Sequence, residues 1–102
     1  MQKIICILEE LSNLLFLCNQ NIQANWLRQR SNALADASKD QEREILAEIK
    51  KSIAGMGSLS DIYLVPPHSS GLMKSQANKK LYELLKELDS EVHRLLGLQM
   101  FS

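Results

Sequence analysis

Apolar residues recur along the first part of the chain at alternating steps of four and three positions, the spacing that places side chains on one face of an α-helix. This first stripe consists of Ile4, Leu8, Leu11, Leu15, Cys18 and Ile22. Five more apolar residues widen it: Ile5, Ile7, Leu14, Phe16 and Leu17. We therefore predict a helix over residues 2–18 that needs packing partners on more than one side, either at the centre of the fold or in a dimer interface.

Two further helical patterns follow, separated by short polar breaks. The cluster Asn19-Gln20-Asn21 predicts the first break, because asparagine can cap either end of a helix. A second helix is expected over residues 21–37, with one face formed by Trp26, Leu27, Ala33, Leu34 and Ala37. Ser38 and Gln41 have the spacing of a capping box at the start of a third helix over residues 39–54. The inward face of that helix is predicted to hold Ile45, Leu46, Ile49 and Ile53.

The helical pattern stops between residues 55 and 74, which hold both prolines and three of the four glycines of the chain. This composition predicts a loop. Within it, residues 62–65 could form a short strand, an extended arm, or a helical turn capped by Ser58 or Asp61.

A last helix is predicted over residues 75–97, where Gly97 is suited to end it. Its apolar face comprises Leu81, Leu85, Leu88, Val92 and Leu95. The expected fold is therefore one all-α domain over residues 1–102, a four-helix arrangement with a long loop containing Gly and Pro before the last helix.

Charge and cysteine content narrow the function classes. Twelve basic and twelve acidic side chains cancel, and each half of the chain is balanced by itself, which argues against a nucleic-acid partner. Polar residues interrupt every long uncharged stretch, so no membrane span and no membrane association is expected. Cys6 and Cys18 lie twelve positions apart on one predicted helix, about 18 Å, beyond the reach of a disulfide. Free thiols used for packing suggest the cytoplasm, although a disulfide between subunits is an alternative.

The chain offers few residues for catalysis or metal binding. Only His68 and His93 are available as histidines, and neither has a cysteine, histidine or carboxylate partner at the spacing of a metal site. No nucleophile motif or paired-carboxylate motif is present. We therefore predict a protein that is not an enzyme and uses no metal or cofactor.

The most distinctive local chemistry lies in the segment that follows the third predicted helix. Gly55 and Gly57 permit unusual backbone angles and close approach, while Ser58 and Asp61 add side-chain acceptors. A phosphate-binding turn is one interpretation, but no Lys-Ser/Thr pair follows the glycines and no strand precedes them. A helix stop followed by a capped turn is the other interpretation, and the one favoured by the residues.

The same segment carries a family resemblance. Residues 54–62 have the sequence Ala-Gly-Met-Gly-Ser-Leu-Ser-Asp-Ile, which resembles the Gly-Gly-Met-Gly-Ser-aromatic/Leu-Asn-Asp-Leu signature of a small uncharacterised bacterial all-helical domain family. Ala54 and Ser60 depart from that signature. Trp26 and the leucine-rich last helix match other features of the family. The resemblance implies a bacterial helical domain of the kind that often binds partner proteins, some of them as immunity proteins.

The leading expectation is thus a bacterial protein-interaction domain in the cytoplasm, which as an immunity-like protein would neutralise a toxin. We expect its partner or ligand contacts at six loop residues: Gly55, Gly57, Ser58, Asp61, Tyr63 and His68. Two alternatives remain open. One is a structural homodimer formed through the first helix and the apolar tail Leu98, Met100 and Phe101. The other is a site for a small ligand or phosphate metabolite at residues 55–61. The zero net charge argues against a basic nuclease toxin as the target.

Overall fold

The computed structural model describes residues 2–54 and 62–97, and this part of the chain is all-α. It contains four α-helices: α1 (Gln2–Leu17), α2 (Asn21–Ala35), α3 (Lys39–Ala54) and α4 (Lys74–Leu96). A 3-10 turn, His68–Ser70, precedes α4. The predicted four-helix arrangement is confirmed, and each predicted helix end lies within two residues of the observed one.

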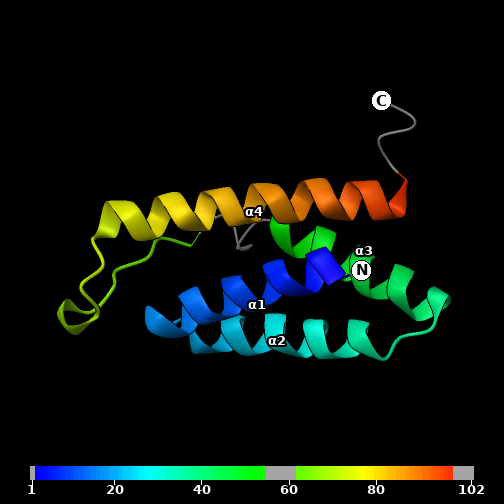
Figure 1. The fold of residues 1–102 in the computed structure, drawn as a ribbon, viewed down its shortest axis with the longest axis horizontal. Coiled ribbons are helices and arrows are strands. Elements are labelled where there is room, and N and C mark those ends of the chain that lie inside the picture. Colours follow the sequence, from blue (N-terminus) through cyan, green and yellow to red (C-terminus); the bar gives the residue numbers. More distant parts are fainter. Residues whose placement is uncertain (1, 55–61, 98–102) are drawn as a thin grey trace.

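The helices are arranged around α1. Figure 1 shows α1 and α2 side by side as an antiparallel pair, with α4 along the opposite side of α1. The third helix, α3, packs against both α4 and α2. Because α1 contacts helices on two sides, its wide apolar stripe is covered within the chain, as one of the two sequence interpretations required.

The buried residues confirm most of the first stripe and correct its end. Ile4, Leu8, Leu11, Leu15 and Cys18 are all buried in one apolar cluster that includes residues of every helix. Ile22, the last predicted member, is instead 83% exposed. The chain turns between α1 and α2, so the helical spacing does not continue across residues 18–21 and Ile22 belongs to a different helix.

The turn after α1 is closed by an asparagine in the left-handed conformation. Asn19 has φ 65°, and its N–H donates to the carbonyl of Phe16 at 3.1 Å. The N–H of Gln20 donates to the carbonyl of Leu15 at 2.8 Å. Together the two bonds form a Schellman motif, which satisfies carbonyls that the helix end would leave free. The predicted capping role of asparagine is thus confirmed at the end of α1.

The buried face of α2 differs from the predicted one. Leu27 and Leu34 are buried as expected, but Ala33 is exposed, and Trp26 and Ala37 are only half-buried. The remaining positions of the buried face are the small residues Ala24 and Ser31. Small side chains allow the axes of α1 and α2 to approach closely, so a face without large apolar residues can still be buried.

The predictions for the last two helices are confirmed in detail. Ser38 and Gln41 form the capping box of α3, with N–H to side-chain oxygen distances of 3.0 and 3.4 Å. The predicted inward residues of α3 are buried or packed against the core. Gly97 ends α4 with φ 73°, and its N–H donates to the carbonyl of Arg94 at 3.2 Å.

The two thiols differ in their surroundings. Cys18 is buried, and burial raises the pKa of its thiol. Cys6 is exposed, so the predicted packing role applies to Cys18 and not to Cys6. Both are free cysteines. No helix in the described residues is both long and apolar enough to cross a membrane.

Candidate functional site

The loop that precedes α4 projects beyond the ends of α1 and α4 (Figure 1). Its first part, residues 62–67, has no regular secondary structure. Tyr63 is 65% exposed, Leu64 is fully buried and Val65 is 56% exposed. This alternation is the one expected of extended backbone, and Pro66 favours the same conformation at Val65. Of the three predicted forms for this segment, the structure therefore shows the extended arm.

The arm is held to α4 by one side-chain amide. Asn78 Oδ1 accepts a hydrogen bond from the N–H of Leu64 at 2.7 Å, and Asn78 Nδ2 donates to the carbonyl of Leu64 at 2.9 Å. The same Nδ2 also donates to the carbonyl of Lys74 at 2.8 Å. The buried backbone of Leu64 is therefore satisfied in both directions, as it would be by a neighbouring strand.

The second part of the loop is a tight turn that leads into α4. Pro67 adopts φ −67° and ψ 152° before the 3-10 turn, and Ser70 Oγ donates to its carbonyl at 2.7 Å. Ser70 Oγ also accepts the N–H of Leu72 at 3.2 Å. Gly71 follows with φ 71°, a backbone conformation that glycine adopts without strain. These bonds fix the return of the chain toward α4.

The arm and the turn enclose an open groove of about 830 Å³, which we call the loop groove. Its walls combine residues of the arm, the turn and the start of α4: Tyr63, Val65, Pro66, His68, Gly71, Leu72, Met73, Lys74 and Ser75. Tyr63 and His68, two of the predicted contact residues, thus lie on one surface. Gly55, Gly57, Ser58 and Asp61 lie outside the described residues.

The structure adds three residues to the site that the sequence analysis did not select. Val65 and Met73 are large apolar residues exposed in the groove, and Lys74 supplies a positive charge. Apolar residues in a loop gave no periodic pattern by which to assign them to a surface. Asn78, which anchors the arm, carried a weak signal, since asparagine is a poor residue for a helix interior.

The loop groove combines apolar and cationic side chains. Its described walls offer an aromatic ring, aliphatic side chains and one cationic side chain, with no carboxylate among them. Within the described residues, no group of three or more His, Cys, Asp or Glu is arranged to hold a metal ion.

Comparisons with known proteins identify no relative. No family model, curated protein or solved structure matches this chain. The arguments on function that follow therefore rest on the geometry and chemistry of the chain itself.

Two polar clusters on α4 lie away from the loop groove. His93 Nε2 contacts Lys50 Nζ of α3 and lies 3.6 Å from Asp89 Oδ1. Glu91 is buried and accepts two hydrogen bonds from Arg94, at 3.0 and 2.6 Å. These bonds, together with the positive charges of Arg94 and Lys3, hold the pKa of Glu91 below its usual value against the opposing effect of burial. Both clusters join or stabilise helices, and neither borders the groove.

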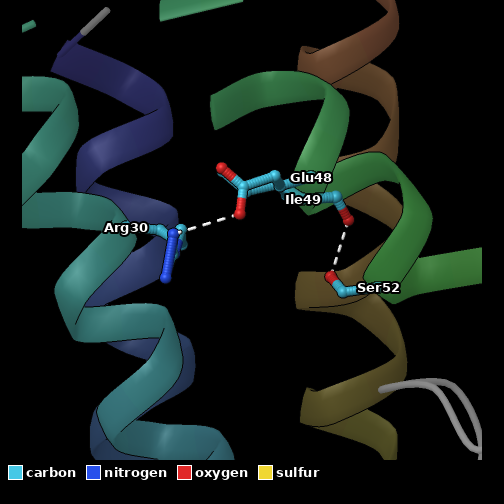
Figure 2. A network of polar contacts seen from close by, with 4 residues as sticks. All are labelled: Arg30, Glu48, Ile49 and Ser52. Atoms are coloured by element: carbon cyan, nitrogen blue, oxygen red, sulfur yellow. Dashed lines mark hydrogen bonds and ion pairs between the residues drawn. The ribbon is translucent and has the colours of Figure 1, made fainter. Parts of the chain in front are cut away.

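A third polar contact fastens α2 to α3. Figure 2 shows Arg30 reaching across to Glu48, with 3.2 Å between Nη1 and Oε2. In the same view, Ser52 Oγ donates to the carbonyl of Ile49 at 2.6 Å within α3. The guanidinium of Arg30 also lies 4.8 Å from the centre of the Trp26 ring. This is the geometry of a cation–π pair, and Trp26 also packs at the edge of the core.

A second hollow, of about 460 Å³, runs along α4. It is lined by Ile53, Ile62 and α4 residues that include Leu81, Tyr82 and Leu85. Ile53 and Ile62 flank residues 54–61, most of which lie outside the described part of the chain. This hollow is mainly apolar, although Asn78, Lys86 and Asp89 also line it. Its large exposed hydrophobic side chain is Tyr82.

Proposed function

We propose that this chain is a non-catalytic protein-interaction domain that binds its partner through the loop groove. The observation that carries the proposal is the gathering of three exposed apolar side chains, Tyr63, Val65 and Met73, on one anchored loop. Contiguous apolar surface on a soluble protein commonly marks an interaction site. The anchoring by Asn78 supports the proposal further, because a preordered surface loses less conformational entropy on binding.

In its finer form, the proposal is an immunity-like bacterial protein that acts in the cytoplasm. The family resemblance of residues 54–62 and the two free thiols support this form. The balanced charge supports a target recognised by shape and apolar contact. A toxin gene beside the gene for this chain would support the immunity role, whereas a metabolic operon would favour the small-ligand alternative.

The described part of α1 leaves less apolar surface for a homodimer interface than the sequence suggested. Most apolar residues of α1 are buried against α2 and α4 within one chain. Leu17, 44% exposed, is the one large hydrophobic residue of α1 that the described structure leaves exposed. A dimer would therefore depend on surfaces other than the main stripe of α1, and light scattering over a range of concentrations tests for it.

The proposal is tested by affinity capture from the native host with matched tyrosine variants. Tyr63 and Tyr82 are almost equally exposed, at 65% and 66%, but only Tyr63 lies in the loop groove. Tyr63→Ala should reduce recovery of a specific protein at least tenfold, while Tyr82→Ala should leave recovery unchanged. Equal recovery with both variants, or no specific protein with the unmodified chain, would contradict the proposal.

A further inference from the structure

The extended arm presents a free backbone edge. Both polar backbone groups of Leu64 are bound by Asn78. In extended backbone, the N–H and C=O groups of successive residues point to opposite sides, so those of Tyr63 and Val65 point away from Asn78. No hydrogen bond in the described structure uses the backbone N–H or C=O of Tyr63 or Val65. An exposed edge of this kind is a template for an added strand.

The surroundings of this edge favour an apolar segment. Tyr63 and Val65 project from the same side of the arm, and Met73, 63% exposed, lines the same groove. An added strand would place every second side chain on this apolar surface, since side chains alternate along extended backbone. The edge supplies affinity through the main chain, and the groove supplies side-chain selectivity.

The positive charge of Lys74 in the loop groove favours a partner that carries a carboxylate. None of the described lining residues is acidic, so Lys74 has no carboxylate partner within the groove. The first turn of α4 also has no acidic side chain. The leading amides of a helix have no partner within the helix and carry partial positive charge, so a negative group is stabilised beside Lys74. An anionic side chain or chain end would therefore complement this end of the groove.

We propose that the partner contributes an extended peptide segment that pairs as a β-strand with residues 63–65, places alternate apolar side chains in the loop groove and sets a carboxylate beside Lys74. This inference rests on the proposed function and names the class of partner. The occupant is a segment of another protein, and pairing between copies of this chain is an outcome that the test distinguishes.

The test begins with a library of displayed random octapeptides, selected on the intact chain. Selected peptides are then synthesised with blocked ends, and their affinities are measured by fluorescence anisotropy. We expect enrichment of peptides with apolar residues at every second position and at least one Asp or Glu. A selection that yields no alternating apolar pattern would overturn the inference.

The decisive measurement is an N-methyl scan of the selected peptide, which removes one backbone N–H at a time and leaves the protein intact. Strand pairing predicts losses of about tenfold or more at alternate positions only, because one hydrogen bond facing the edge is lost in each case. A loss that is uniform, or absent at every position, overturns strand pairing. If capture in the host still depends on Tyr63, the proposed function survives that result.

Two pairs of protein variants complete the test. Val65→Pro removes the N–H of Val65 at a position whose extended backbone tolerates proline, whereas Val65→Thr keeps it. Lys74→Gln removes the positive charge in the groove, whereas Lys79→Gln removes one elsewhere on α4. Peptide affinity should fall about tenfold in the first member of each pair and little in the second. Equal effects within both pairs, or a complex in which the bound segment comes from a second copy of this chain, contradict the inference.

Discussion

Asn78 is the residue on which the position of the extended arm depends. Asn78→Ala would leave the N–H and C=O of fully buried Leu64 without partners. An unsatisfied buried polar group costs about 1–3 kcal/mol, so the free energy of unfolding should fall by about that amount. Urea denaturation followed by the fluorescence of Trp26 measures the change.

The matched control for this variant is Asn32→Ala, at an exposed position of α2. Both substitutions raise helix propensity equally, so their difference isolates the contact with the arm. The control should change the free energy of unfolding by no more than about 0.5 kcal/mol. Equal stability of the two variants would show that Leu64 does not depend on Asn78.

Glu91 makes the free energy of unfolding depend on pH in the acidic range. Because Arg94 holds the pKa of Glu91 below its unfolded-state value, the ionised carboxylate stabilises the fold above the unfolded-state pKa. That stabilisation is lost as the pH falls through the lowered pKa. Arg94→Gln should therefore lower the free energy of unfolding at neutral pH. The difference in that free energy between the variant and the unmodified chain should become smaller in acid.

The control for the pH effect is Arg28→Gln. Arg28 donates to the neutral amide oxygen of Asn13 at 2.8 Å and has no carboxylate partner among the described residues. Its substitution should change stability by a similar amount at every pH. Urea titrations from neutral pH to below the lowered pKa of Glu91 compare the two variants, and parallel curves for both would contradict the role assigned to Arg94.

At the scale of helices and turns, Asn19 determines where α1 ends. Its φ of 65° is costly for residues with branched Cβ atoms, so Asn19→Val should lower the free energy of unfolding by about 1–2 kcal/mol. Asn19→Gly is the control, since glycine adopts this conformation readily. Urea denaturation should show the glycine variant at least as stable as the unmodified chain. A stable valine variant would indicate that the turn has another backbone conformation.

The helices could be predicted from the sequence because each has either strong apolar spacing or recognisable caps. The spacing of Leu81, Leu85 and Leu88 defined α4, and Ser38 with Gln41 marked the start of α3. Apolar spacing wrongly predicts that Ile22 is buried. The regular spacing continues in the sequence across residues 18–21, but the helix ends there at a cap. The spacing also failed for Ala24 and Ser31, whose small side chains give little apolar signal.

The site was less predictable than the helices for a physical reason. Tyr63 and His68 were selected from loop chemistry, and the structure places both in the loop groove. The path of the arm, however, depends on a bond between Leu64 and Asn78, fourteen positions apart. Such a contact between a backbone and a distant side chain leaves no periodic trace in the sequence, so the exposure of Val65 and Met73 followed only from the structure.

For the molecule as a whole, the central position of α1 predicts that substitutions within the first apolar stripe will lower the free energy of unfolding by very different amounts. Leu15→Ala removes a fully buried side chain and should lower the free energy of unfolding by about 2–5 kcal/mol. Ile22→Ala, in the same predicted stripe but exposed, should change it by less than about 0.5 kcal/mol. Thermal or urea unfolding of both variants decides the point. Similar losses would imply that Ile22 is covered in solution, for example by a second copy.

The loop groove is formed by residues 63–75, a continuous stretch of the chain. Its anchor points are Leu64, near the start of that stretch, and Asn78, shortly after its end. Apart from Leu64 and Cys18, the buried residues of the described core belong to helices. Under the proposed function, the residues that recognise the partner and most residues that form the core are therefore in separate parts of the sequence. Replacing the exposed residues between Leu64 and Asn78 would then change which partner the chain binds. The helices would not need to repack.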